Sequence, residues 1–418
     1  MLRLSSFIVL LWLALPAQAV LDIEVTGAGE HQTSVAIVPF AGDDFSEQRI
    51  SDIVASDLIR TGLFKLIDPA GKAPHGTPEV KFADWTNVEA LTVGRVIKLP
   101  DGRIEVRFYL LDTVKRTELI AQAVSAKKDQ MRAIAHRIAD LIYSKLTSNP
   151  GVFSTRIAYV NRQGRYNRLV VADSDGYGEQ TLLGISQPIM SPSWSPDGNT
   201  LAYVSFEQGR AMVFTHSLLT QKRILLAAFS GSNSAPTWSP DGKQLAIVLT
   251  HEGNSQIYLV RADGTDLRRV SRTDTIDTEP SFSPDGQHLV FTSDRGGSAQ
   301  IYRMSVAGGG AQRLTFEGSN NFSPRYSPDG KSFVFSHFNG GTFYIATQDF
   351  VTKQIQILTA GGWDKKPSFS PNGKLVLFAT EVRGRGILAT VSSDGRVKQK
   401  MTPQQGDIRE PVWGPFTR

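Results

Sequence analysis

The stretch Pro280-Ser-Phe-Ser-Pro-Asp-Gly286 decides the fold, because the chain repeats its pattern at nearly constant spacing. Four close copies begin at Pro192, Pro236, Pro324 and Pro367, and a shorter copy, Pro411-Val-Trp-Gly-Pro-Phe416, stands near the C-terminus. The first prolines are 44, 44, 44, 43 and 44 residues apart. A repeat of about 40–45 residues that combines short β segments with turn residues is typical of a four-stranded β-propeller blade.

Each repeat divides into short β segments separated by turn residues. In the third repeat the segments are Glu279–Phe282, Leu289–Ser293, Gln300–Met304 and Gln312–Thr315. Ser-Pro-Asp-Gly suits a type I turn, with glycine free to adopt a positive φ. We expect the aromatic residue two positions after each first proline to pack between blades rather than to form a ligand cage.

The number of repeats predicts how the propeller closes. The segment Arg156–Val160 resembles the second strand of a repeat, but no Pro-x-aromatic segment precedes it. The last copy, Pro411-Val-Trp413, has no second strand after it. The two halves complete one blade if they pair, which would leave no open sheet edge in the ring. The sequence thus predicts six blades over residues 151–418, closed by the C-terminal strand.

The first 33 residues carry two signals. Arg3, an apolar run over residues 7–15 and the ending Pro16-Ala-Gln-Ala19 are typical of a signal peptide over residues 1–19. We expect export to the bacterial periplasm, with cleavage after Ala19. Residues 20–33 begin with Val20–Val25, which alternates apolar and acidic side chains. This pattern indicates an extended segment that adds a strand to a partner's sheet or to its own, and an ordinary edge strand is the plain alternative.

Residues 34–150 lack the repeat and indicate an α/β domain, with helices on one side of a small mixed sheet. The clearest helix carries Met131, Ile134, Ile138 and Ile142 on one face. His136 falls at the boundary of that face, where we expect it to pack or cap rather than to bind a metal.

Several function classes are disfavoured by composition and motifs. The chain has no cysteine, and its 45 Lys and Arg and 40 Asp and Glu are interspersed, so we expect neither disulfides nor nucleic-acid binding. Metal-ligand spacing among the seven histidines, a G-x-S-x-G elbow and a P-loop are all missing from the sequence. We therefore predict no catalytic residues, metal or cofactor, although a ring of aspartates around a propeller channel could hold a cation.

A peptidase and a glycan-binding or hydrolytic propeller are the alternatives to a protein-binding scaffold. A peptidase of the prolyl-oligopeptidase type would need an α/β-hydrolase domain beyond the propeller, where this sequence shows none. A glycan-binding or hydrolytic propeller would need paired carboxylates along the channel, and this remains the alternative function.

The loops that lead into the innermost strands gather around one mouth of a propeller channel. Loops on a rigid scaffold often carry binding, so these polar loops predict a rim for a protein or peptide. The candidate rim residues are Ser232, Asn233, Ala235, Thr278, Glu279, Asn320, Asn321, Asp364 and Lys365.

Beyond the repeats, the chain resembles the TolB family, the periplasmic β-propeller proteins of the bacterial Tol–Pal system. The most specific match is the join of His136–Leu146 to Gly151–Val160. Ala36–Phe40, Asp57–Gly62 and Gly176-Tyr177 also match, and the resemblance covers nearly all of the chain after the signal peptide.

This resemblance implies a monomeric scaffold without a membrane anchor that maintains outer-membrane integrity and supports constriction at cell division. It implies binding of the lipoprotein Pal at the propeller mouth, where Ser232, Ala235 and Thr278 fall at contact positions. Ser232 stands where some relatives carry histidine. The N-terminal segment would bind the periplasmic domain of TolA, and colicins or other outer-membrane proteins would be further partners. The residues assigned to TolA are Val20, Leu21, Asp22, Ile23, Glu24 and Val25.

Overall fold

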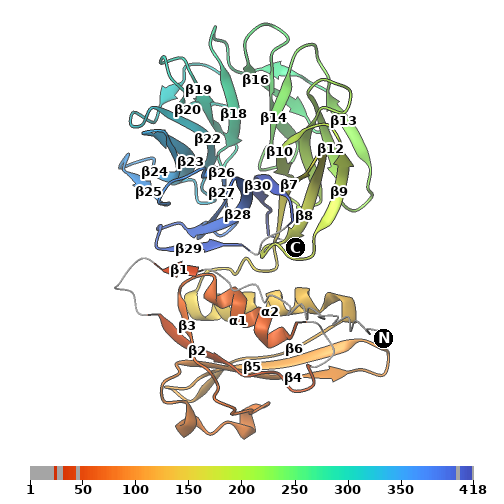
Figure 1. Ribbon diagram of the computed structural model, residues 1–418, viewed down its shortest axis with the longest axis vertical. Coiled ribbons are helices and arrows are strands. Elements are labelled where there is room, and N and C mark those ends of the chain that lie inside the picture. The colour runs from red at the N-terminus through yellow and green to blue at the C-terminus, as the bar shows by residue number, and fades with distance from the viewer. Residues whose placement is uncertain (1–22, 26–31, 44–47, 402–404, 417–418) are drawn as a thin grey trace, which may run out of the picture.

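The computed structural model describes residues 23–25, 32–43, 48–401 and 405–416. The chain forms a small layer of sheet and helices beside a ring of β-sheets (Figure 1). The predicted signal peptide and its cleavage position lie outside the described residues. No helix in the described ranges is long and apolar enough to cross a membrane.

The N-terminal layer is built on one mixed sheet with the strand order β3-β2-β4-β5-β6. Strand β2 (Thr33–Ile37) runs parallel to β3 (Phe64–Leu66) and β4 (Ala90–Lys98), whereas β5 (Ile104–Asp112) and β6 (Thr117–Ala126) continue as an antiparallel meander. Helices α1 (Ile50–Ile59) and α2 (Met131–Thr147) lie on one side of the sheet, as predicted, and this side faces the ring (Figure 1). The N-terminal layer also contains the short 3-10 helices η1 (Thr77–Glu79), η2 (Phe82–Trp85) and η3 (Lys128–Gln130).

Buried apolar side chains explain the placement of the two helices. Ile134, Ile138 and Ile142 recur on one side of α2 and are 3% exposed or less. They share a core with Leu58 of α1 and Phe108 of the sheet. The spacing in the sequence therefore identified the face of α2 that packs on the sheet.

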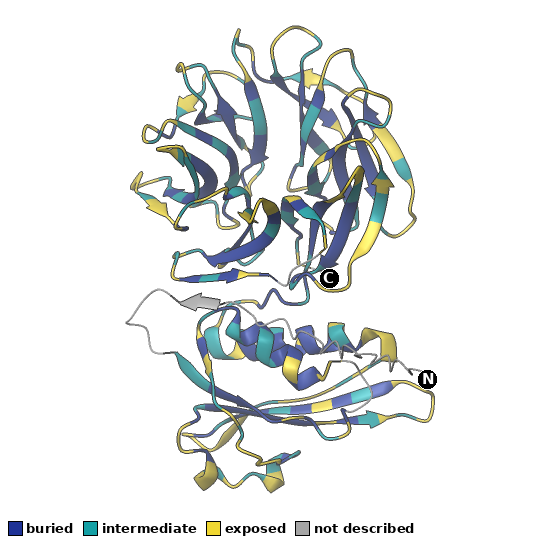
Figure 2. Cartoon of the chain, in the orientation of Figure 1, coloured by how far each residue is buried: buried dark blue, intermediate teal, exposed yellow. Residues whose placement is uncertain are grey.

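The ring consists of six sheets, which confirms the predicted six-bladed propeller. Inner strands are largely buried, and exposed residues concentrate on outer strands and loops (Figure 2). In order from the channel outward, blade one contains β30 (Asp407–Trp413), β7 (Arg156–Gln163), β8 (Tyr166–Asp173) and β9 (Gln180–Ile185). Blade two contains β10 (Ile189–Trp194), β11 (Thr200–Ser205), β12 (Met212–Ser217) and β13 (Arg223–Ala227). Blade three contains β14 (Asn233–Trp238), β15 (Gln244–Leu249), β16 (Gln256–Arg261) and β17 (Arg268–Arg269). Blade four contains β18 (Asp277–Phe282), β19 (His288–Ser293), β20 (Gln300–Ser305) and β21 (Gln312–Arg313). Blade five contains β22 (Asn320–Tyr326), β23 (Ser332–Asn339), β24 (Thr342–Asp349) and β25 (Ile355–Ile357). Blade six contains β26 (Lys365–Phe369), β27 (Leu375–Val382), β28 (Arg385–Ser392) and β29 (Val397–Lys400).

Closure by the C-terminal strand is confirmed. Strand β30 pairs antiparallel with β7, with Trp413 opposite Ile157. The indole Nε1 of Trp413 donates a hydrogen bond to Thr155 Oγ1 at 2.8 Å, and the side chain is 6% exposed. The two ends of the propeller sequence thus form a single sheet.

The repeated turns and aromatics behave as predicted. In the first copy the amide of Gly198 donates to the carbonyl of Ser195 at 2.9 Å, and its φ is +70°. Trp194 is 8% exposed and packs in a core that includes Ala158 of blade one and Tyr203 of blade two. These aromatics are therefore packing residues between blades.

The N-terminal layer lies against blades six and one (Figure 1). A Cβ atom placed on Gly62, which follows α1, would lie 2.1 Å from Val397 Cγ2 in blade six. Asn372 of blade six also donates a hydrogen bond to the carbonyl of Pro150 at 2.8 Å. The close contact at Gly62 leaves no room for a side chain between the two parts.

Candidate functional site

Six residues, each preceding the first proline of a repeat, form a ring around the propeller channel. All six adopt a left-handed conformation, with φ between 46° and 56°, which costs a residue other than glycine about 1 kcal/mol or more. At each position the pairing with the next strand skips a register, because proline cannot donate to the ladder and the strand bulges. We call these residues the channel ring: Ser191, Ala235, Glu279, Ser323, Lys366 and Glu410.

Side chains of the channel ring bind one another across the channel. Lys366 Nζ of blade six lies 2.6 Å from Glu279 Oε1 of blade four and 3.6 Å from Glu410 Oε2 of blade one. Ser323 donates its hydroxyl to Glu279 Oε1 at 2.6 Å and its amide to Oε2 at 2.8 Å. Four blades thus contribute to one network at the channel.

Mutual attraction between the side chains of the channel ring favours the charged forms of Glu279 and Lys366. Burial alone would raise the pKa of Glu279, but the Lys366 ammonium and the hydrogen bonds lower it to about 2. Burial opposes the charge on Lys366 as well, yet Glu279 and Glu410 raise its pKa. The guanidinium of Arg325 adds a second positive charge near the two carboxylates, so two cations balance two anions. A lysine ammonium thus stands between the two carboxylates that a channel cation would have used.

The environment of each residue in these loops, buried or exposed at the mouth, depends on how far it precedes the first proline of its repeat. The third residue before the proline is buried in every blade, at 5% exposure or less. The second residue before it is exposed or partly exposed at the mouth, because successive side chains of a strand point to opposite sides. We call this second set the mouth ring: Met190, Ser234, Thr278, Phe322, Lys365 and Arg409.

Three of the nine predicted rim residues are buried, and their polar side chains form hydrogen bonds within the propeller. Asn233 donates its amide to the carbonyl of Ala211 in the neighbouring blade at 3.1 Å. Asn321 donates to Gln300 Oε1 at 2.7 Å, and Asp364 accepts a hydrogen bond from Thr380 at 2.6 Å. Their hydrogen-bonding groups hold blades or strands together.

The other predicted rim residues divide between the channel and the mouth. Glu279 and Ala235 belong to the channel ring, and the Glu279 side chain is 17% exposed. Thr278 and Lys365 belong to the mouth ring. Ser232 is exposed, and Asn320 is partly exposed with its Oδ1 accepting from the amide of Ala299 at 3.1 Å.

Four mouth-ring residues and one aromatic platform are absent from the predicted rim residues. Alignment of the repeats on their prolines would have found Met190, Ser234, Phe322 and Arg409. Trp363, 57% exposed, stacks on Phe343 with ring centroids 5.8 Å apart. Lys365 Nζ lies 4.0 Å from both ring centroids, so the mouth presents a cation between two aromatic rings.

The N-terminal segment adds a fifth strand to the propeller's own sixth blade. Strand β1 (Ile23–Val25) pairs antiparallel with β29, with Ile23 opposite Gln399 and Val25 opposite Val397. Val20, Leu21 and Asp22 lie outside the described residues. Of the two predicted outcomes, a strand added to a partner's sheet or to the chain's own, the structure shows Ile23–Val25 in the second arrangement, at the edge of blade six.

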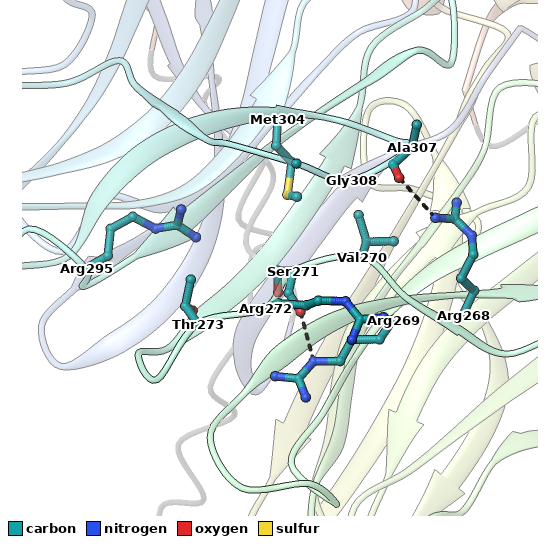
Figure 3. Close-up of a pocket in the computed structure, with 11 residues that line it drawn as sticks. Arg268, Arg269, Val270, Ser271, Arg272, Thr273, Arg295, Met304, Ala307 and Gly308 are labelled. Carbon is teal, nitrogen blue, oxygen red and sulfur yellow. Dashed lines mark hydrogen bonds between the residues drawn. The ribbon is translucent and has the colours of Figure 1, made fainter.

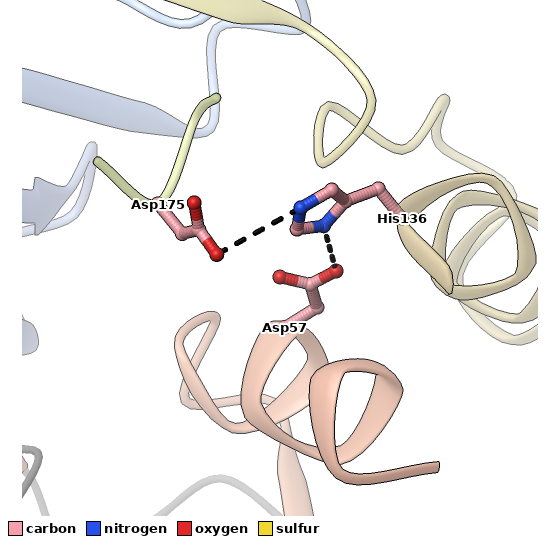
Figure 4. A group of neighbouring side chains, drawn as sticks. All are labelled: Asp57, His136 and Asp175. Carbon is pink, nitrogen blue, oxygen red and sulfur yellow. Dashed lines mark hydrogen bonds and ion pairs between the residues drawn. The ribbon is translucent and has the colours of Figure 1, made fainter. Parts of the chain in front are cut away.

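A second polar centre joins the N-terminal helices to blade one (Figure 4). His136 Nδ1 of α2 lies 2.6 Å from Asp57 Oδ2 of α1, and His136 Nε2 lies 3.7 Å from Asp175 Oδ2 in the turn after β8. The expectation that His136 lies on the polar or boundary face of the helix was wrong, because the residue is 1% exposed. Its acidic partners on two elements compensate for the burial of a charged ring.

Two arginines lie against Asp57, His136 and Asp175, and we call the whole group the interdomain cluster. Arg132 Nη2 lies 2.5 Å from Asp175 Oδ2 and its Nε lies 3.2 Å from Asp173. Arg60 Nη2 lies 2.5 Å from Asp57 Oδ1, and its Nη1 donates to the carbonyl of Ser174 at 3.1 Å. Three carboxylates thus face two guanidiniums and one imidazole.

The protonation state of His136 decides what the interdomain cluster can do. Burial alone would lower the pKa of His136, but the Asp57 carboxylate, with Asp173 and Asp175, raises it to about 10. Asp57, His136 and Asp175 are close enough to bind a metal ion. A protonated imidazole has no free lone pair, however, and the neighbouring guanidiniums already neutralise the carboxylates. The geometry therefore fits an ion-pair contact between domains better than a metal site.

Comparisons with known proteins agree along the chain. The TolB amino-terminal domain family matches residues 21–119, and the TolB beta propeller domain family matches residues 143–417. The chain is 58% identical over 416 residues to the Tol-Pal system protein TolB of Nitrosomonas europaea, covering 99% of this chain and 98% of the relative. It is 60% identical over 402 residues to the protein of the same name from Dechloromonas aromatica, covering 96% and 94%.

A solved structure has the same architecture throughout. The crystal structure of TolB from Acinetobacter baumannii superposes with a TM-score of 0.87 at 37% sequence identity, covering 95% of this chain and all of that chain. Both domains, their order and the ring of six blades are shared over that length. The chain belongs to the TolB family.

Proposed function

We propose that this protein is a non-enzymatic binding scaffold of a Tol–Pal system in the periplasm. The observation that carries the proposal is the mouth of the propeller, where the mouth ring surrounds a channel bridged by neutralised ion pairs. Such a surface offers partners a rigid, shallow platform. The names of the relatives support the assignment to a Tol–Pal system.

In this proposal the mouth binds the soluble domain of the lipoprotein Pal. Thr278 and Lys365 contribute partly exposed side chains, and the exposed Trp363 supplies an aromatic anchor of the kind that dominates protein interfaces. In this proposal Ser232, Ala235 and Asn320 contribute to the same surface from blades three and five. Asn233, Asn321, Asp364 and Glu279 would then act by shaping the loops, since their polar groups are already bonded within the propeller.

Titration calorimetry with the soluble domain of Pal from the same organism tests this assignment. The Thr278→Arg variant places a large charged side chain on the mouth ring, and we expect it to weaken binding at least tenfold. The control is Thr220→Arg, on the exposed turn between β12 and β13 at the opposite end of the strands. No binding by the folded parent would contradict the Pal assignment and reopen the glycan-binding alternative.

The N-terminal segment, residues 20–33, binds the periplasmic domain of TolA in this proposal. Because β1 occupies the edge of β29, that binding must compete with the pairing inside blade six. Hydrogen exchange of residues 20–33, measured with and without Pal, tests whether the mouth controls this pairing. Equal protection in both states would refute such coupling.

Together these contacts would link the envelope layers, maintain outer-membrane integrity and support constriction at cell division. Export with cleavage after Ala19 would deliver the chain to this compartment, leaving the partner-binding segment 20–33, the α/β domain 34–150 and the propeller 151–418. Mass spectrometry of the mature N-terminus in a periplasmic extract tests this step. An intact Met1 would contradict it.

A further inference from the structure

A pocket of about 320 Å³ lies between blades three and four, away from the channel (Figure 3). It runs from β17 and the loop after it to β20 and the turns at both ends of that strand. Four of its lining residues are arginines, and none is acidic. The arginines are Arg268, Arg269, Arg272 and Arg295.

Two of these arginines have acidic partners and serve the propeller itself. Arg295 Nη2 donates to both carboxylate oxygens of Asp277, at 2.8 and 2.9 Å. Arg269 Nη1 lies 2.7 Å from Glu252, and its Nε donates to the carbonyl of Ser271 at 2.9 Å. The positive charges of Arg269 and Arg295 are therefore matched.

Among the residues that the structure describes, the other two arginines have no acidic partner. Arg268 reaches across the groove to blade four, where its Nη2 donates to the carbonyl of Val306 at 3.0 Å and its Nη1 to that of Ala307 at 3.5 Å. Arg272 is exposed, and within the described ranges it forms no ion pair or hydrogen bond. Two positive charges thus remain uncompensated at one pocket.

Donors approach this pocket from opposite sides. Figure 3 shows Arg295 and Thr273 on one side and Arg268 beside Ala307 on the other, with Met304 and Val270 between them. The Nε and Nη2 atoms of Arg295 bond Ser293 and Asp277, whereas its Nη1 bonds none of the residues described. A ligand in the pocket would therefore meet guanidinium groups from both blades above an apolar floor.

We propose that this pocket binds a phosphate monoester. A phosphate monoester carries a charge of about −1.5 to −2 at pH 7, which matches the two uncompensated arginines. Its oxygens accept from several directions, and guanidinium forks are suited to them. A volume of about 320 Å³ is at the small end of ligand pockets, enough for the phosphate and a short polar group. This site does not depend on the proposed binding of Pal or TolA.

Glycerol 3-phosphate is the first probe, used with the mature protein in calorimetry at fixed ionic strength. We expect saturable binding at one site, weakened at least tenfold in Arg268→Gln/Arg272→Gln, since charge-assisted hydrogen bonds to phosphate are lost. The control variant Arg165→Gln/Arg210→Gln removes the same charge from exposed positions in blades one and two. It should bind like the parent, and all three proteins should melt at similar temperatures without ligand.

Equal affinity of the parent and the pocket variant, or equal loss in the control variant, would overturn the proposal, because the attraction would then be general. Failure of glycerol 3-phosphate to bind the parent would overturn it as well. Sedimentation with phosphatidylcholine vesicles, with or without phosphatidate, then separates two sources of the phosphate. Pelleting that needs phosphatidate and the pocket arginines indicates a lipid headgroup. Binding of glycerol 3-phosphate without pelleting indicates a soluble ester.

Discussion

Replacing Lys366 by methionine should destabilise the propeller from its centre. The change keeps most of the side-chain volume but leaves the buried carboxylate of Glu279 without its ammonium partner. The lowering of the Glu279 pKa from 4.5 to about 2 corresponds to about 3–4 kcal/mol, at about 1.4 kcal/mol for each unit of pKa. Breaking a buried ion pair typically costs about 3–5 kcal/mol. The two values agree, so we expect a loss of about 3 kcal/mol at pH 7.5.

Thermal unfolding monitored by near-ultraviolet circular dichroism would measure this loss. About 3 kcal/mol corresponds to a melting temperature lowered by roughly 6–12 °C in a domain of this size. The double variant Lys366→Met/Glu279→Gln is the matched control, since it removes the unpaired charge and should recover much of the loss. Melting of Lys366→Met within 2 °C of the parent would refute the reasoning.

The pH dependence of the same variant provides a second check with a definite sign. In the parent, the depressed pKa of Glu279 contributes stability above about pH 4.5 that is lost as the pH falls toward 2. Without Lys366, burial raises that pKa, and the variant gains stability on acidification through protonation of Glu279. The gap between parent and variant should therefore narrow from pH 7.5 to pH 4. A gap that stays constant would contradict the assignment of the loss to Glu279.

Three further perturbations test the other contacts. Because the pKa of His136 is raised from 6.5 to about 10, its contribution to stability should be complete below pH 6.5 and fall by about 1.4 kcal/mol per pH unit toward pH 10. Urea unfolding should show this slope in the parent and not in His136→Gln. Gly62→Ala, which would place a Cβ 2.1 Å from Val397 at a φ of +69°, should lower the free energy of unfolding by about 1 kcal/mol or more, with an unchanged melting curve as the contrary result. Deletion of Pro411–Arg418 removes buried Trp413, which alone costs about 3–5 kcal/mol, so the propeller should melt roughly 10 °C lower. A truncated chain that melts within a degree or two of the parent would rule out this role of β30 in closure.

Local chemistry explains why the propeller was predictable from the sequence. Ser195 and Gly198 close a turn within four residues, and the same turn recurs in the four other full copies of the repeat. The aromatic residue beside this turn packs between blades, and its fixed position in the repeat makes it recognisable in the sequence. Closure followed from counting, because one strand was missing near Arg156 and one was left over at Trp413.

The functional surface was only partly predictable because it depends on bulges and on distant contacts. A single-residue bulge turns Glu279 into the channel and leaves Thr278 at the mouth, which a loop assignment does not resolve. Asn233 and Asn321 appear as polar loop residues in the sequence, but each bonds a neighbouring blade. His136 meets Asp57 and Asp175 only in three dimensions, so the periodicity of its helix did not indicate its burial.

The pairing of β30 with β7 has a kinetic consequence. Arg162 and its partner Asp407 are separated by most of the propeller sequence, so among the pairings between two strands of residues 151–418, that of β30 with β7 joins the segments furthest apart in the sequence. Blades two to six can each form from neighbouring segments, but the ring cannot close before the strand over 407–413 is available. Until then β7 presents an unpaired edge to other chains. Blade one should therefore set the rate of ring closure, and a chaperone that shields β7 should raise the folding yield more than one that shields any other blade.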